Sequence, residues 1–401
     1  MSRLPTLAAL LAAALAAPAL HAQLAVRGET VYTMAGAPIR DGVVLVRDGR
    51  VERVGPASQV PVPAGWRVLT AKVVTPGLVD AHSVVGLAGM LGQPHDQDQL
   101  DRTDAVQPEL RAVDAYNAAD ELVAWLRGFG VTTVHTGHGP GALASGQTMV
   151  VKTRGAHVGE ALVDSATMVA FTLGRSVASN YKSPGTRARG VAMLRTEFLK
   201  AREYERKQKA GTQQARDLKM EALLEVLNRR RPALFTVQQA PEILAALRLA
   251  EEFGFRLVLD GAAEAYLVAD EIRAAGVPVI LHPTMVRTFG ETENASLETA
   301  KLLRDRGIPV ALQSGFEGYV PKTRVVLFEA AVAAANGLGM EDALRAVTLD
   351  AARAIGMERR VGSLEPGKDG DLALFDGDPF EHTSHVCAVV IEGEVVSETC
   401  R

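Results

Sequence analysis

The chain has 401 residues, of which 47% are hydrophobic and 22% are charged, and its formal net charge is −4. This composition excludes a disordered chain and predicts a large globular core. The slightly acidic balance gives no electrostatic reason to expect nucleic acid or an anionic membrane surface as a partner.

Residues 1–22 have the pattern of a secretory signal peptide. Arg3 supplies the positive charge, an apolar run extends from Leu7 to Leu20, and the small residue Ala22 precedes the expected cleavage point. The run is short for a membrane span, and no later stretch has the roughly 20 apolar residues that a span needs. We therefore expect an exported protein, periplasmic or secreted after cleavage near Ala22, with no membrane partner.

Residues 23–72 contain short β-branched runs separated by turn residues. The dipeptide Asp48-Gly49 lies between two of these runs and is typical of a two-residue hairpin turn. Residues 365–401 have the same character. We predict that 23–72 plus 365–401 form one small composite β-sandwich domain from both ends of the chain.

Residues 73–364 alternate strand-like runs with amphipathic helical segments. Seven runs are predicted as buried strands: residues 73–80, 131–136, 167–172, 234–237, 257–259, 279–281 and 308–312. Strands that alternate with helices favour a parallel sheet covered by helices. The expected class is therefore α/β, a TIM-like barrel of the (β/α)8 type, although an eighth strand is not evident.

Residues 186–231 differ from the rest of this region because they are dense in Arg, Lys, Glu and Gln. Apolar residues recur within them, which predicts two long helices joined near residues 210–212. The simplest interpretation is a solvated helical insertion. The alternative is a lid over the mouth of the barrel or a docking surface.

Both cysteines lie near the C-terminus, at Cys387 and Cys400, on either side of a predicted hairpin. A turn at Gly393-Glu394 would place the two cysteines opposite each other, and a turn at Glu392-Gly393 would make the pair diagonal. An oxidising compartment favours a disulfide between them. Two unrelated free thiols are the alternative.

Three motifs resemble those of amidohydrolases, particularly imidazolonepropionase-like ones. In chain order they are Val74-Thr75-Pro76-Gly77-Leu78-Val79-Asp80-Ala81-His82, Ala343-Leu344-Arg345-Ala346-Val347-Thr348-Leu349-Asp350-Ala351-Ala352 and Gly362-Ser363-Leu364-Glu365-Pro366-Gly367-Lys368-Asp369-Gly370-Asp371-Leu372. The resemblance covers nearly the whole mature chain. It implies a barrel with a small β-sandwich made from both termini, and hydrolysis of carbon–nitrogen bonds other than peptide bonds.

The resemblance also implies one or two divalent metal ions, which lower the pKa of a bound water and polarise the scissile carbonyl. The family ligands are two His at the end of the first strand, a His on each of two middle strands and an Asp on the last. His82 matches the first of these, and the second falls on Val84. The middle-strand positions fall on Thr236, in a register that could shift by two residues, and near Gly261, and the Asp position falls on Gly315. A catalytic zinc ion needs about three protein ligands. We therefore expect a degenerate metal site.

A rebuilt, histidine-rich site is the alternative to an empty one. His82, His135, His138 and His282 all lie at the ends of predicted strands, which meet at one face of a barrel. They are candidate ligands for one divalent metal such as zinc, and equally candidate catalytic acid–base groups that need no cofactor. Glu317 is a further candidate base. The competing interpretation is that each histidine bonds its own loop.

Two functions remain open at this point. The first is an exported hydrolase that acts on a small-molecule substrate through the rebuilt site, as the resemblance implies. The second is a catalytically silent binding module, or a partner subunit in a homo- or hetero-oligomer with an active amidohydrolase. The missing ligand positions favour the second function.

Overall fold

The computed structural model describes residues 23–90, 93–212, 215–282, 284, 289–315 and 326–400. The predicted signal peptide, residues 1–22, lies outside the described residues, as does Glu317. Within the described ranges, no helix is both long enough and apolar enough to cross a membrane.

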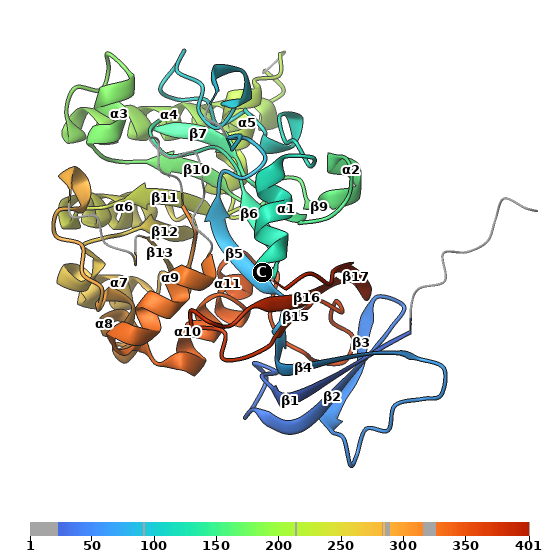
Figure 1. Ribbon diagram of the computed structural model, residues 1–401. Coiled ribbons are helices and arrows are strands. Elements are labelled where there is room, and N and C mark those ends of the chain that lie inside the picture. Colours follow the sequence, from blue (N-terminus) through green and yellow to red (C-terminus); the bar gives the residue numbers. More distant parts are fainter. Residues whose placement is uncertain are drawn as a thin grey trace, which may run out of the picture.

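Strands from the two ends of the chain form one seven-stranded sheet (Figure 1), in the order β17-β16-β15-β4-β1-β2-β3. Their bounds are β1 Leu24–Val31, β2 Ile39–Arg47, β3 Arg50–Pro56, β4 Arg67–Pro76, β15 Leu372–Phe375, β16 Val386–Ile391 and β17 Glu394–Ser397. Arg47 pairs with Arg50, so the predicted Asp48-Gly49 turn is confirmed. Both turn residues have a positive φ, as such a turn requires.

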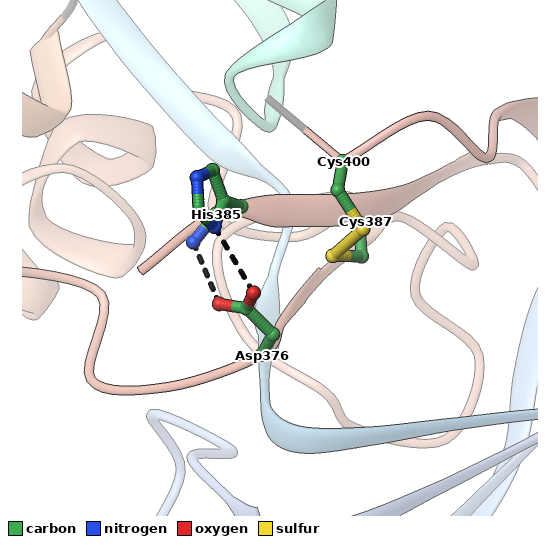
Figure 2. The surroundings of a disulfide bond; sticks show 4 residues. All are labelled: Asp376, His385, Cys387 and Cys400. Carbon is green, nitrogen blue, oxygen red and sulfur yellow. Dashed lines mark hydrogen bonds and ion pairs between the residues drawn. A yellow bond between two sulfur atoms is a disulfide. The ribbon is translucent and has the colours of Figure 1, made fainter. Parts of the chain in front are cut away.

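The C-terminal hairpin turns at Glu392-Gly393, because Ile391 pairs with Glu394. Of the two turns considered from the sequence, this is the one that makes the cysteines diagonal. The sulfur atoms of Cys387 and Cys400 are joined at 2.08 Å. Figure 2 shows this disulfide beside His385, whose Nδ1 lies 3.0 Å from Asp376 Oδ2.

The rest of the chain is an α/β region with two further sheets. One has six strands in the order β14-β13-β12-β11-β10-β7, and the other has four in the order β5-β6-β8-β9. Their bounds are β5 Leu78–Ser83, β6 Val131–Thr136, β7 Ala144–Gln147, β8 Met149–Lys152, β9 Leu162–Asp164, β10 Val169–Thr172, β11 Ala233–Val237, β12 Leu257–Gly261, β13 Val279–Leu281 and β14 Val310–Leu312. Strands β10 to β14 run parallel, and so do β5 and β6.

The first predicted strand of this region, residues 73–80, is divided between two sheets. β4 ends at Pro76 and β5 begins at Leu78, with Gly77 between them. A Cβ atom at Gly77 would overlap the side chain of Thr132, so glycine is required at this point. The chain therefore passes here from the seven-stranded sheet into the α/β region.

The segment 144–152 is a strand that the sequence did not reveal. β7 pairs antiparallel with β10, and β8 pairs antiparallel with β6. Between them, the Thr148 amide donates to Met168 O at 2.9 Å, and its carbonyl accepts from Thr167 N at 2.7 Å. One continuous antiparallel segment thus links the two sheets between β6 and β10. At the other edge, Ser83 of β5 forms a parallel bridge with Gly315 after β14.

Strands from both sheets share one internal apolar cluster. It contains Val79, Val150, Leu234, Val258, Ile280 and Ala311 from β5, β8, β11, β12, β13 and β14. Ala351 and Ala352 of α11 (Leu349–Ala354) close one end of it. The inward residues of these strands therefore pack on one another as a single core.

Helices cover the outside of the strands. Their bounds are α1 Glu121–Gly128, α2 Val158–Ala161, α3 Arg175–Asn180, α4 Arg187–Lys209, α5 Leu218–Leu227, α6 Ala240–Phe253, α7 Ala269–Ala275, α8 Thr299–Asp305, α9 Val326–Ala333 and α10 Met340–Ala346. The two helices predicted within 186–231 are confirmed as α4 and α5. They are not simply solvated, because Leu194, Phe198 and Leu223 are fully buried in the main core.

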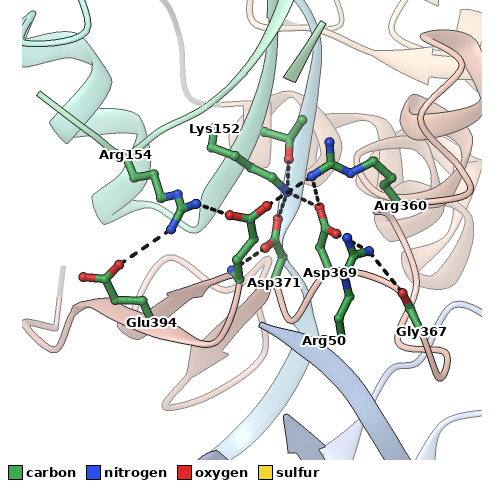
Figure 3. Close-up of polar contacts among 10 residues, drawn as sticks. Arg50, Lys152, Arg154, Arg360, Gly367, Asp369, Asp371 and Glu394 are labelled. Atoms are coloured by element: carbon green, nitrogen blue, oxygen red, sulfur yellow. Dashed lines mark hydrogen bonds and ion pairs between the residues drawn. The ribbon is translucent and has the colours of Figure 1, made fainter. Parts of the chain in front are cut away.

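A buried ionic cluster joins the α/β region to the seven-stranded sheet (Figure 3). Lys152 of β8 is 2% exposed, and its Nζ lies 2.5 Å from Asp371 Oδ2 and 3.1 Å from Asp369 Oδ2. Asp369 also pairs with Arg50 at 2.8 Å and with Arg360 at 3.0 Å. One lysine on β8 is thus held by carboxylates that immediately precede β15.

Candidate functional site

A polar network lies at the carboxyl ends of the parallel strands. His82 is near the end of β5, Thr236 is in β11, Asp260 is in β12 and Gln313 directly follows β14. In barrels of parallel strands, this end is where substrates and catalytic groups meet. All four side chains are at most 8% exposed.

The centre of the network is a buried ion pair. His82 Nδ1 donates to Asp260 Oδ1 at 2.9 Å, and the two residues are 3% and 2% exposed. Thr236 Oγ1 donates to the other carboxylate oxygen, Oδ2, at 2.5 Å, and Gln313 Nε2 donates to Oδ1 at 2.6 Å. Three side chains from three other strands therefore hold the Asp260 carboxylate.

The charges of this pair stabilise each other against burial. Burial alone disfavours the charged form of both groups and so would lower the pKa of His82 and raise that of Asp260. The mutual attraction and the hydrogen bond outweigh this cost. The pKa of His82 is raised above its ordinary value, and the pKa of Asp260 is lowered. The pair is therefore an imidazolium facing a carboxylate until the pH exceeds the raised pKa.

The hydrogen bond to Asp260 also fixes which nitrogen of His82 is available for chemistry. A carboxylate accepts from Nδ1, so the proton that can be exchanged is on Nε2. Nε2 is buried and has no hydrogen-bond partner among the described residues. His82 therefore presents one oriented nitrogen, backed by a carboxylate, as in other histidine general acid–base groups.

A second buried carboxyl group lies two residues before His82. Asp80 Oδ1 accepts from the Ser314 amide at 3.0 Å and from the His82 amide at 3.4 Å, and its Oδ2 bonds the Ser314 hydroxyl. Burial raises the pKa of Asp80 to about 7, although the hydrogen bonds from Ser314 oppose the rise. This carboxyl group connects β5 to the segment after β14.

His135 lies beside His82, with the ring centroids 5.6 Å apart. Both of its nitrogens are already bonded. Nδ1 donates to Ala81 O at 2.7 Å, and Nε2 accepts from Thr148 Oγ1 at 2.6 Å. Burial, followed by the charge of His82, lowers the pKa of His135 to about 3. His135 is thus a neutral histidine that positions β6 between β5 and β8.

The other two predicted site histidines have surroundings of their own. His138 packs against Gly146 of β7, where a Cβ would lie 2.7 Å from its Nε2, and burial lowers its pKa to about 4. His282 follows β13 and lies against Gly315, where a Cβ would lie 2.7 Å from its Nε2. Of the four histidines, the structure therefore gives ring contact to His82 and His135. Glu317 lies outside the described residues.

The described residues do not fit a binuclear metal centre. Within the described ranges, no group of three or more His, Cys, Asp or Glu side chains is placed to hold a metal ion. Gly315, where the resemblance places the family aspartate, has a φ of +67°, and the His282 ring fills the space that a side chain would use. Thr236, where the resemblance places a family histidine, bonds Asp260. The four-histidine metal site therefore finds no geometric support among these residues.

Sequence reasoning missed Asp260 and Asp80 as members of the site. Each is a buried polar residue in or at the end of an apolar strand run, a signal that was available from the sequence. Histidine is the usual ligand type, whereas the partner of His82 is a carboxylate from a different strand.

Comparison with known proteins shows the relationships of this chain. A sequence model of the Amidohydrolase family matches residues 268–397. The chain is 28% identical over 387 residues to the imidazolonepropionase of Rhizorhabdus wittichii, covering 87% of this chain and 92% of that protein. It is 25% identical to "Amidohydrolase tasK" of Hapsidospora irregularis, but spans only 39% of that protein's length.

A solved structure is similar over almost the full length. The crystal structure of an amidohydrolase from Thermotoga maritima superimposes with a TM-score of 0.88 at 32% identity, and the match covers 94% of this chain and 100% of that one.

Proposed function

The chain belongs to the amidohydrolase family and is imidazolonepropionase-like, and on that basis we propose that it is an exported hydrolase of carbon–nitrogen bonds other than peptide bonds. The observation that carries the proposal is the buried His82–Asp260 pair, which leaves His82 Nε2 unbonded within the described residues. The names of the similar proteins support the reaction class. The signal-like residues 1–22 support export to the periplasm or medium.

We further infer that the two α/β sheets close into one eight-stranded barrel, with the seven-stranded sheet as a composite β-sandwich domain. The shared internal cluster and the linking segment 144–152 support closure. The bridge between Ser83 and Gly315 supports it at the other edge. In such a barrel, His82, Thr236, Asp260 and Gln313 face one common mouth.

In this proposal the His82–Asp260 pair acts without the family's binuclear metal centre. Val84, Thr236 and Gly315 supply no ligand at three of the family's positions, and the Asp260 carboxylate already accepts three side-chain hydrogen bonds. Divalent ions of the zinc type need about three ligands. The Asp260 carboxylate instead orients the His82 imidazole and stabilises its charged form.

The chemistry that follows is proton transfer at His82 Nε2. Above its raised pKa, the neutral imidazole takes a proton from a water molecule as that water attacks the carbonyl carbon of the substrate. The resulting imidazolium is stabilised by Asp260 and then returns the proton to the leaving nitrogen, so that the carbon–nitrogen bond breaks and the histidine is regenerated. Hydrolysis therefore depends on deprotonated His82, and activity is expected to rise with pH through that pKa.

A second candidate function is supported by the burial of the same network. His82 and Asp260 are nearly inaccessible, and Asp260 is fully hydrogen-bonded, as in a purely structural core. This favours a silent binding module or a partner subunit in an oligomer with an active amidohydrolase. The two candidates differ in whether His82 Nε2 meets a substrate.

The test is hydrolysis of a panel of lactams, cyclic imides and N-acyl amino acids by the mature protein, before and after dialysis against a chelator. We expect activity that survives dialysis, no stoichiometric metal by mass spectrometry, and loss of turnover in His82→Gln and Asp260→Asn. His157→Gln is the matched control, because His157 is exposed and distant in sequence from the network. Activity that is lost on dialysis and restored by zinc would show a rebuilt metal site. Normal turnover in His82→Gln would refute the mechanism, and no turnover on any substrate would favour the second candidate.

A further inference from the structure

A large cavity lies at the end of the strands opposite to the polar network. Its volume is 1090 Å³, and its lining includes residues 229–232, 255–258 and 274–278, which precede or begin β11, β12 and β13. Residues 353–357, at the end of α11 and after it, form another wall. In barrels of this type the amino ends of the strands usually serve stability rather than chemistry. A charged cavity at this end therefore needs its own explanation.

Arginine dominates the polar lining of this cavity. Six arginines line it, against three acidic residues: Arg229, Arg230, Arg231, Arg248, Arg256 and Arg353 face Asp164, Glu251 and Glu271. The whole chain, by contrast, has a formal net charge of −4. The cavity is thus a local concentration of positive charge on an acidic protein.

Three of these arginines are neutralised by carboxylates. Arg230 pairs with Glu225 at 2.7 Å, and Arg231 is 3.9 Å from Asp164. Arg353 pairs with Asp350 at 3.0 Å. The charges of these three arginines are compensated by carboxylates of the protein itself.

The other three arginines have no such partner in the part of the chain that the structure describes. Arg229 donates to Gly254 O at 3.1 Å, and Arg256 donates to Arg230 O at 3.0 Å. These backbone bonds position the two guanidinium groups without cancelling their charge. Arg248 of α6 has neither an ion pair nor a hydrogen bond within the described ranges. Three guanidinium groups without an ion-pair partner in the described residues thus line one cavity, together with the two carboxylates Glu251 and Glu271, which pair with none of them.

The remainder of the lining is apolar. Leu244 and Leu247 of α6, Phe255, Ile355 and Met357 all contribute to it. Pockets that bind small molecules typically combine such a surface with a few polar groups and have volumes of roughly 300–1,000 Å³. The combination of an apolar surface and guanidinium groups that form no ion pair in the described residues matches a ligand that has an apolar body and an anionic head.

We propose that this cavity is a binding site for an amphiphilic organic anion, separate from the polar network at the opposite end of the strands. The anionic group is held by Arg229, Arg248 and Arg256, because guanidinium groups bind carboxylate and related oxyanions through paired, charge-assisted hydrogen bonds. The apolar body lies against Leu247 and Phe255. This inference does not depend on the proposed hydrolytic activity.

The test uses 2-naphthoate as a carboxylate probe and 2-naphthylmethanol as its uncharged counterpart, titrated into the mature protein by isothermal calorimetry. We expect one naphthoate bound per chain, with affinity that falls as salt is added. The alcohol should bind at least about tenfold more weakly, because it lacks the charge-assisted contacts.

Two variants locate the site. The double substitution Arg248→Gln with Arg256→Gln should weaken naphthoate binding by at least about tenfold, since it removes two of the three guanidinium groups that have no ion-pair partner. Arg195→Gln is the control, because Arg195 is on α4, pairs with Glu252 at 2.8 Å and does not line the cavity. Equal affinity for the acid and the alcohol, unchanged binding in the double variant, or no binding at millimolar probe would each overturn the proposal. Circular dichroism of each variant confirms that the fold is retained.

Discussion

Replacing Lys152 by Met should strongly destabilise the protein. The Lys152 side chain is almost fully buried and pairs with two carboxylates that are equally buried. Methionine has a similar volume but carries no charge, so Asp371 would keep its buried charge without a cation. Breaking a buried pair in this way typically costs about 3–5 kcal/mol of unfolding free energy.

The surroundings of the two carboxylates predict which second substitution restores stability. Asp369 retains Arg50 at 2.8 Å and Arg360 at 3.0 Å after Lys152 is lost. Among the described residues, Asp371 retains only the Glu392 amide, at 2.8 Å, as the donor to its other oxygen. Adding Asp371→Asn to Lys152→Met should therefore recover much of the loss. Adding Asp369→Asn should not, because it removes the carboxylate partner of Arg50 and leaves Arg360 with Glu392 alone, at 3.1 Å.

Urea unfolding followed by circular dichroism measures each variant against the parent protein. Lys200→Met is the matched control, because Lys200 is exposed on α4 and its pair with Glu197 is a surface pair that adds little stability. A Lys152→Met protein as stable as the parent would refute the reasoning. Better rescue by Asp369→Asn than by Asp371→Asn would also refute it, since that result would make Asp369 the carboxylate that depends on Lys152.

Three further predictions concern stability. Burial raises the pKa of Asp80 in the folded protein to about 7, above the ordinary value of an aspartate. The native state therefore binds an extra proton, and the contribution of this group to the free energy of unfolding is lost as pH rises from about 4 to about 7, by at most about 4 kcal/mol. The unfolding free energies of the parent and of Asp80→Asn are measured across that range and subtracted from each other. The subtraction removes the contribution of His135, whose lowered pKa makes stability change with pH in the opposite direction. A difference that stays constant with pH would contradict the prediction. Reducing the Cys387–Cys400 bond, or replacing both residues by Ser, should lower the unfolding free energy by up to about 3 kcal/mol, as closure of a short loop implies. Mass spectrometry of the unreduced protein after alkylation checks that the bond is present. Two alkylated thiols would show that it is not. Phe198→Ala should cost about 3–5 kcal/mol, because Phe198 is fully buried with its ring 5.9 Å from that of Phe171; a calorimetric melting temperature equal to the parent's would mean that α4 is not part of the core.

Strands of the α/β region could be predicted where their sequences are runs rich in apolar and β-branched residues. The predicted bounds 131–136 and 279–281 are identical to the observed bounds of β6 and β13. The segment 144–152 was missed because Ser145, Gly146 and Gln147 interrupt its apolar character. Its first half pairs with β10 and its second half with β6, so its position is decided by two distant partners and not by local propensity.

The candidate site was predicted in location but not in composition. His82 and His135 do lie together, since both are on adjacent parallel strands. The sequence could not show that Asp260 of β12 would pair with His82, or that Gln313, after β14, would bond the same carboxylate, because side-chain direction depends on the register of neighbouring strands. It also could not show that His138 would turn toward Gly146.

The position of Lys152 has a consequence for the order in which the protein is made. Its two carboxylate partners, Asp369 and Asp371, emerge from the ribosome more than half a chain length later. Until then, a nascent chain that has already assembled β5, β6 and β8 has a lysine at a position that the finished protein buries. The buried pairing of Lys152 can therefore form only after residues 369–371, which directly precede β15, have been synthesised.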